Sequence, residues 1–143
     1  MSQAVVIVDT NVVVSGLLTR DPNSPPAAIL DAMLDGSLRF IVSDALVAEY
    51  VAVLSRPAIA RLHRLSAGEI DRIVRAIVLS ARFVTPDAAT DSAPDRGDQH
   101  LWDLLDSVPG ALLVTGDAVL RRSRRHARVL SPAEFLESRR KAE

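Results

Sequence analysis

The chain has 143 residues, with 17 Lys and Arg against 18 Asp and Glu, and it contains no cysteine. This length suits one domain with one hydrophobic core. The absence of cysteine excludes disulfides, thiolate metal sites and cysteine nucleophiles. Sixteen of the basic residues are arginines and the only lysine is Lys141, so a mechanism that uses an active-site lysine is not expected.

The first half of the chain alternates between strand and helix signals. In chain order we predict a strand at 4–8, a helix at 12–18, a loop at 19–26, a helix from the proline pair to 35, a strand at 38–42 and a helix at 44–54. Gly36 ends the second helix, and Ser43 is placed to cap the third. Pro57 is expected to break the helical pattern that precedes it.

The second half continues this alternation. Ser66 and Glu69 have the spacing of a capping box and open a helix, as do Ser131 and Glu134 for the last helix. Between them we predict a strand at 82–84, a polar loop at 85–97, a helix at 98–107, a strand at 111–115, a short helix at 117–122 and a strand at 127–130. The alternation predicts an α/β fold with a mostly parallel sheet covered on both faces. We expect one domain over residues 1–143, with its core at about 4–137.

Neither a membrane nor an export signal is expected. No apolar run approaches the roughly 18 residues that span a bilayer, and no basic region precedes the first apolar stretch. The lack of cysteine fits a reducing compartment, and we expect a cytoplasmic protein.

Charges of opposite sign are separated along the chain. Residues 85–117 carry seven acids and one base, a net charge of −6, and residues 118–143 carry eight bases and three acids, a net charge of +5. Such a separation suits a metal-dependent enzyme with a polyanionic substrate. Two solvated faces of opposite sign would explain it equally well.

Acidic side chains follow two of the predicted strands directly. Asp9 comes after the first strand, and Asp117 follows the strand at 111–115 after one glycine. Ligands bind beyond the carboxyl ends of strands in such folds, and adjacent strands lie about 4.8 Å apart. If these two strands are neighbours, both carboxylates could reach one metal ion. The alternative is that each aspartate only caps the helix after it.

Further carboxylates extend this set. Glu49 stands alone among the apolar residues of the helix at 44–54, which indicates a buried helix in which the carboxylate needs a partner or a metal. An edge position that reaches solvent is the alternative. Asp95 and Asp98 lie at the start of a helix, where acids also favour the helix dipole. Several ionised carboxylates in one pocket repel one another, and oxygen ligands without a histidine cluster favour Mg²⁺ or Mn²⁺ over zinc.

Four motifs in this order and spacing resemble those of PIN-domain ribonucleases. They are Ile7-Val8-Asp9-Thr10-Asn11-Val12, Val42-Ser43 through Glu49, Asp95-Arg96-Gly97-Asp98-Gln99-His100-Leu101, and Val114-Thr115-Gly116-Asp117. The match covers about residues 4–137, and the bacterial toxins of toxin–antitoxin pairs (VapC-like) are the most similar subgroup. Each motif alone is only weakly specific for the family, whereas all four in this order are strong evidence for the resemblance.

The resemblance implies a three-layer α/β/α sandwich and Mg²⁺- or Mn²⁺-dependent cleavage of RNA. It assigns metal binding and catalysis to the four acids Asp9, Glu49, Asp98 and Asp117, with Asp95 as a further candidate ligand. It makes Asn11, Ser43 and Thr115 supporting polar residues. Members of the family often carry more acids where this chain has Arg96 and Gly97, which puts a second metal site in question.

The basic residues after Asp117 are candidates for RNA binding. Together with Arg96 they are Arg121, Arg122, Arg124 and Arg125. A solvated basic loop is the alternative, and Arg96 could instead pair with Asp95. The three histidines are scattered and are interpreted as surface or helix residues, and Tyr50 and Trp102 as core or interface residues.

The leading hypothesis is a metal-dependent endoribonuclease with a small antitoxin protein as its partner. A mean hydropathy of +0.18 favours a homodimer or another bound partner. A phosphoaspartate enzyme that uses Asp9 is disfavoured, because residue 11 is Asn and the only lysine is near the end of the chain. A non-catalytic PIN-like module that binds RNA or protein remains the main alternative, motivated by Arg96 and Gly97.

Overall fold

The structure is a computed structural model of the chain, and it describes residues 4–142. The ends of the expected domain, residues 1–3 and 143, lie outside the described residues. No helix within the described range combines the length and apolar character needed to cross a bilayer.

All pairings between the strands are parallel, as the alternation predicts. The strands are β1 (Val6–Val8), β2 (Ile41–Val42), β3 (Arg82–Phe83), β4 (Leu112–Val114) and β5 (Val129–Leu130). Three of them form a sheet in the order β1-β4-β5, and β2 pairs with β3. A parallel bridge between Val6 and Phe40 links the two sheets. The strand order is therefore β3-β2-β1-β4-β5, in which β1 and β4 are direct neighbours.

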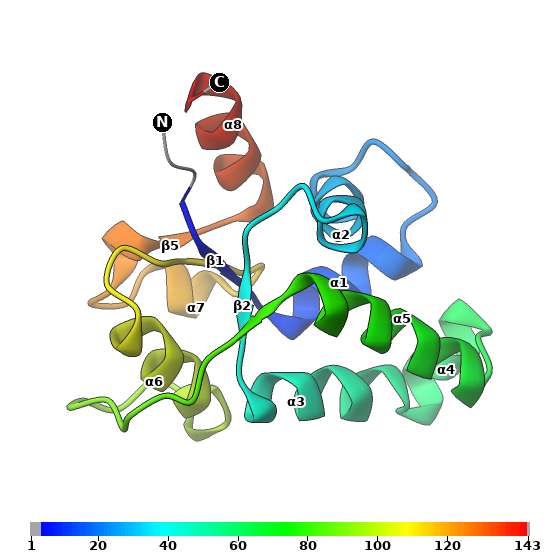
Figure 1. Ribbon diagram of the computed structural model, residues 1–143, viewed down its shortest axis with the longest axis horizontal. Helices are drawn as coiled ribbons and strands as arrows, with labels where there is room; N and C mark the ends of the chain where they lie inside the picture. Colours follow the sequence, from blue (N-terminus) through cyan, green and yellow to red (C-terminus); the bar gives the residue numbers. More distant parts are fainter. Residues whose placement is uncertain (1–3, 143) are drawn as a thin grey trace.

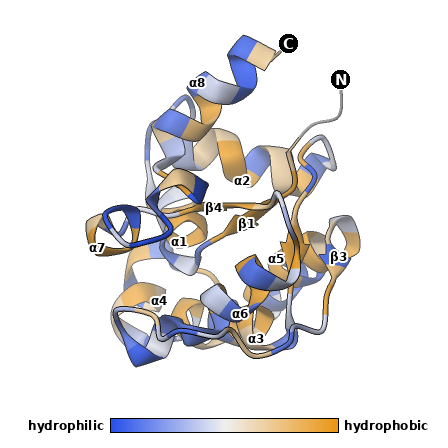
Figure 2. Cartoon of the chain, turned by 90° about the vertical axis from the view of Figure 1, so that its left-hand side faces the viewer, coloured by the Kyte–Doolittle hydropathy of each residue, from blue (hydrophilic) through white to orange (hydrophobic). Residues whose placement is uncertain are grey.

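Helices cover both faces of these strands. They are α1 (Thr10–Leu18), α2 (Pro25–Asp35), α3 (Asp44–Leu54), α4 (Pro57–His63), α5 (Ala67–Ser80), α6 (Gln99–Ser107), α7 (Ala118–Arg121) and α8 (Pro132–Ala142), with short 3-10 turns η1 (Arg96–Asp98) and η2 (His126–Arg128). Figures 1 and 2 show α2 and α8 on one side of the strands and α3 and α6 on the other. This arrangement confirms the predicted α/β fold with a parallel sheet between layers of helices.

The core lies between these layers. The residues of β1 are fully buried, and the apolar colouring of the central strands in Figure 2 reflects this burial. Tyr50 and Trp102 are also in the core, as expected. Helices α1 and α2 pack so closely that a Cβ at Gly16 would lie 2.6 Å from the carbonyl oxygen of Pro26. Glycine is therefore needed at this crossing.

Helix α3 ends at Leu54, before Pro57, as expected. Helix α4 was not predicted from the sequence, and Pro57 occupies its first turn, where the missing N–H costs nothing. One expectation about the helices is wrong. Helix α3 is not buried all round, since Ala48 and Ala52 are exposed and Val51 is 42% exposed. Small apolar side chains are commonly found at protein surfaces, so an apolar sequence does not by itself imply burial on every side.

Candidate active site

A cavity of about 390 Å³ opens at the carboxyl ends of β1 and β4. It is lined by Asp9, Thr10, Asn11, Val14, Ser15, Glu49, Val53, Arg56, Asp98 and Asp117. The four acids that the sequence analysis assigned to metal binding therefore come together, although they belong to four separate segments. The position follows the rule that ligands bind beyond the carboxyl ends of parallel strands.

Asp9 lies at the bottom of this cavity and is 4% exposed. Its Oδ1 accepts a hydrogen bond from the Thr10 N–H at 2.8 Å, so it caps α1 as well as facing the cavity. Its Oδ2 accepts from the Thr115 hydroxyl at 2.8 Å and from the Asn11 amide at 3.2 Å. Burial raises the pKa of Asp9, and the nearby charge of Glu49 adds to this effect, while the hydrogen bonds oppose it.

Thr115 links the ends of the two central strands. Its hydroxyl donates to Asp9 and accepts from the backbone N–H of Asp117 at 3.0 Å. Asn11 completes the link, because its side-chain oxygen accepts from the Gly116 N–H at 3.0 Å. These two residues thus hold the turn that carries Asp117 against the turn that carries Asp9. The supporting role that the resemblance implies is consistent with these contacts.

Glu49 reaches the cavity from α3 and does not stand alone. Its Oε1 accepts a hydrogen bond from the Thr10 hydroxyl, and its Oε2 lies 3.0 Å from Nε2 of His100. The side chains of Glu49 and His100 are 29% and 17% exposed. The predicted need for a partner is therefore met by a hydroxyl and an imidazole.

Asp98 and Asp117 complete the acidic set. Asp98 precedes α6 without forming a side-chain capping bond to it, so capping does not explain its position. Burial together with the charges of Asp9, Asp95, Asp117 and Glu49 raises the pKa of Asp98 to about 6. Asp117 caps α7 by accepting from the Val119 N–H at 2.8 Å. Desolvation is the main cause of the raised pKa of Asp98, and the neighbouring carboxylates add to it.

The donor chemistry of this cavity fits Mg²⁺ or Mn²⁺, which bind carboxylate and hydroxyl oxygens. As the side chains stand, no three acidic or histidine groups among residues 4–142 are grouped closely enough to hold one ion. Binding a cation therefore requires these carboxylates to draw closer together. Burial is the main cause of the raised pKa of Asp98, and a bound cation would offset the repulsion between carboxylates that adds to it.

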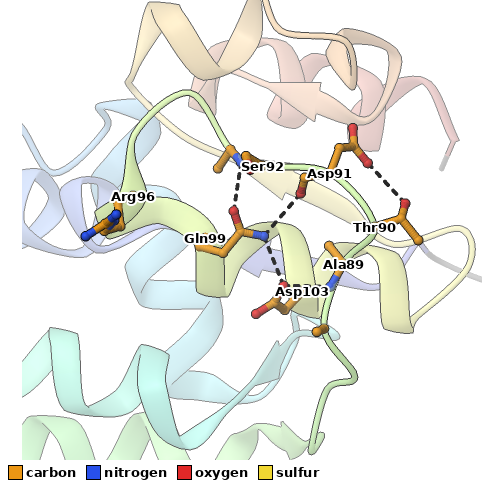
Figure 3. Close-up of a pocket in the computed structure, with 9 residues that line it drawn as sticks. Ala89, Thr90, Asp91, Ser92, Arg96, Gln99 and Asp103 are labelled. Atoms are coloured by element: carbon orange, nitrogen blue, oxygen red, sulfur yellow. Dashed lines mark hydrogen bonds between the residues drawn. The ribbon is translucent and has the colours of Figure 1, made fainter.

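Three other predicted site residues lie away from the cavity lining. Ser43 is buried and caps α3 by accepting from the Leu46 N–H at 3.2 Å. Asp95 caps η1 through the Gly97 N–H at 2.8 Å, and it acts on Asp98 only through its charge. Arg96 lines a separate pocket beside α6, and Figure 3 shows it set apart from Gln99 and Asp103. The suggested pairing of Arg96 with Asp95 is not formed.

Some of the basic side chains after Asp117 form ion pairs or hydrogen bonds within the protein, and others are exposed to solvent. Arg125 is paired with Asp91 and Asp106 and lies over the ring of Trp102 at 4.9 Å, so we withdraw it from the candidate RNA contacts. Arg121 donates to the carbonyl of Thr115 at 3.2 Å, and Arg122 donates to that of Ala118 at 3.3 Å. Arg124 is exposed. None of the four lines the acidic cavity, within the part of the chain that the structure describes.

Three residues of the site were missed by the sequence analysis. Thr10 and His100 contact Glu49, and Arg56 lines the cavity from the start of α4. His100 was interpreted as an ordinary surface or helix residue. No local signal marks His100, because residues two apart on a helix do not face the same side, and its approach to Glu49 depends on how α6 packs against α3.

Of the comparisons with known proteins, one gives a match. The PIN domain family model matches residues 5–119. Neither the curated proteins nor the solved structures yield a significant match. The matched range includes all four acids of the cavity, and PIN domains are generally nucleases. On this match and on its parallel α/β architecture, the chain belongs to the PIN domain family, a family of nucleases.

Proposed function

We propose that this chain is an endoribonuclease that depends on Mg²⁺ or Mn²⁺ and acts in the cytoplasm as the toxin of a toxin–antitoxin pair. The observation that supports the proposal best is the convergence of Asp9, Glu49, Asp98 and Asp117 on one cavity. The choice of RNA and the toxin role rest on the resemblance of the four motifs to VapC-like toxins.

The chain's own residues prepare this chemistry in three ways. Thr10, Asn11 and Thr115 fix both oxygens of Asp9. Thr10 and His100 hold the two oxygens of Glu49. Asp98 and Asp117 add further carboxylates to the cavity lining. A bound divalent cation would supply Lewis-acid activation of water and offset charge on the phosphodiester.

The test is cleavage of RNA by the purified protein with Mg²⁺ or Mn²⁺, using a panel of transfer RNAs and unstructured RNAs. EDTA and Asp98→Asn serve as paired controls. We expect cleavage that both controls reduce by at least about a hundredfold, because a metal centre contributes several kcal/mol of transition-state stabilisation. Undiminished cleavage by a folded Asp98→Asn variant would overturn the assignment of the site.

A non-catalytic PIN-like module is the second candidate. The observation that favours it is that no three acidic or histidine groups among the described residues are yet arranged around one ion. Calorimetric titration with Mn²⁺ separates the two candidates. RNA binding without turnover and without metal binding would favour the module, whereas tight Mn²⁺ binding that Asp98→Asn weakens would favour the nuclease.

We also propose that the chain forms a homodimer and binds a small antitoxin. Its support is the set of exposed large apolar side chains, which includes Val51, Leu62, Leu79, Phe83 and Val119. Light scattering coupled to gel filtration tests the dimer. A small open reading frame encoding a DNA-binding motif immediately upstream, whose product suppresses the RNA cleavage, would support the antitoxin.

A further inference from the structure

Arg56 is the basic residue of the acidic cavity, within the described part of the chain. It lies at the junction of α3 and α4 and lines the cavity together with Val14 and Val53, about two helical turns after Glu49. An arginine side chain that shares a cavity with four carboxylates would ordinarily form an ion pair with one of them.

The guanidinium of Arg56 has no such partner. No ion pair or hydrogen bond joins its side chain to the described residues 4–142. This differs from Arg121, Arg122 and Arg125, whose guanidinium groups donate to carbonyls or carboxylates. Arg56 therefore keeps its full donor capacity toward whatever enters the cavity.

The backbone of Arg56 is held firmly. Its N–H donates to the Val53 carbonyl at 3.2 Å, and its own carbonyl accepts from the Ala60 N–H at 2.8 Å. Pro57 follows it in the first turn of α4, and His63 ties α4 to α3 through the Leu54 carbonyl at 2.9 Å. The side chain thus projects from a fixed point beside the acids rather than from a mobile loop.

We propose that Arg56 binds a phosphate of the RNA substrate at the end of the cavity next to Val14 and Val53. This inference rests on the proposed ribonuclease function. An arginine fork matches the geometry of phosphate oxygens and binds them in a bidentate manner. The carboxylates and their cation would then hold one part of the RNA backbone, and Arg56 would hold a neighbouring part.

Two measurements test this inference. The first is the affinity of a labelled single-stranded RNA for the otherwise wild-type chain in EDTA, which suppresses cleavage, with and without Arg56→Ala. We expect Arg56→Ala to raise the Kd about tenfold or more. We also expect the slope of log K against log salt to fall by about 0.7. The second is the KM of cleavage in the otherwise wild-type chain, which Arg56→Ala should raise more than it lowers kcat.

The matched control is Arg61→Ala, which removes the same charge from an exposed position on the same helix that does not line the cavity. Arg56→Lys should give an intermediate affinity, because lysine keeps the charge and loses the fork. Equal unfolding midpoints for all variants exclude a folding defect. If Arg56→Ala and Arg61→Ala behave alike while the wild-type chain cleaves RNA, the inference is wrong and the proposed function stands. If the wild-type chain neither binds nor cleaves RNA, both are wrong.

Discussion

His100 and Glu49 are 51 residues apart in the sequence, yet Nε2 of the imidazole lies 3.0 Å from Oε2 of the carboxylate. The contact joins α6 to α3 at Glu49, which lines the acidic cavity. The other ring nitrogen, Nδ1, is buried and has no hydrogen-bond partner among the described residues. The imidazole is therefore held in the structure by its bond to Glu49.

His100→Ala should weaken metal binding and cleavage together, because partners of ligating carboxylates orient them. We expect a 10- to 100-fold loss in Mn²⁺ affinity by calorimetry. His126→Ala, at an exposed position away from the cavity, is the control and should leave affinity unchanged. Unchanged Mn²⁺ affinity in a folded His100→Ala protein would show that the contact does not position Glu49.

The stability of the metal-free protein should depend on the ionisation of Asp98. Its pKa is about 6 in the folded chain and 3.8 in a model peptide, so the folded state holds the proton more tightly between these values. Its contribution to stability therefore falls as the pH rises through this range. An asparagine side chain cannot ionise, so Asp98→Asn should not lose stability in this way as the pH rises.

In EDTA, the unfolding midpoint of Asp98→Asn should match that of the wild type near pH 4 and exceed it near pH 7. We expect a difference of about 1 kcal/mol after allowing for solvent screening, or about 2–4 °C. Thermal unfolding followed by circular dichroism from pH 4 to 8 measures it. A difference that stays constant over this range would contradict the prediction.

Thr115→Val should destabilise the fold and the site together. Valine has a similar shape but leaves Asp9 Oδ2 without its 2.8 Å donor and the Asp117 N–H without its acceptor. We expect a loss of about 1–3 kcal/mol in urea unfolding, with reduced cleavage. Thr115→Ser keeps the hydroxyl and should recover most of both. A valine variant as stable and active as the wild type would exclude this role.

Arg125→Ala should affect stability rather than RNA affinity. Its side chain is 12% exposed and binds two carboxylates at 3.1 and 2.5 Å, so its removal should cost about 1–3 kcal/mol. Arg124→Ala, at an exposed position, should stay within about 0.5 kcal/mol of the wild type. Unfolding in urea and RNA binding by anisotropy separate these effects. Weaker RNA binding by Arg125→Ala at unchanged stability would restore Arg125 to the RNA contacts.

The helix ends that depend on neighbouring residues were predictable from sequence. The capping boxes at Ser66 and Ser131 form with both of their hydrogen bonds. Gly36 adopts a left-handed conformation with φ of 80° at the end of α2. In each case the residues that begin or end the helix lie within four positions of its boundary. The local sequence is therefore enough to predict where the helix begins or ends.

Features set by distant contacts were not predictable in this way. The acids could be identified because Asp9 and Asp117 follow strands, but the approach of His100 to Glu49 depends on how α6 packs against α3. Likewise, Arg125 was predicted to bind RNA because it lies in a basic segment. Its partners Asp91 and Asp106 are 34 and 19 residues away, so the local sequence does not show that it is already paired. A local charge pattern does not reveal which charges are already paired.

The placement of β4 beside β1 has a consequence for the timing of activity during synthesis. Val8 pairs with Val114, so the strands that carry Asp9 and Asp117 meet only after more than a hundred residues have been made. A nascent chain that exposes β1, α1 and α3 already carries Asp9 and Glu49 but lacks the other half of the cavity. Because the closing contact is long-range and forms late, the nascent chain would not carry a complete acidic cavity until β4 has emerged from the ribosome and docked.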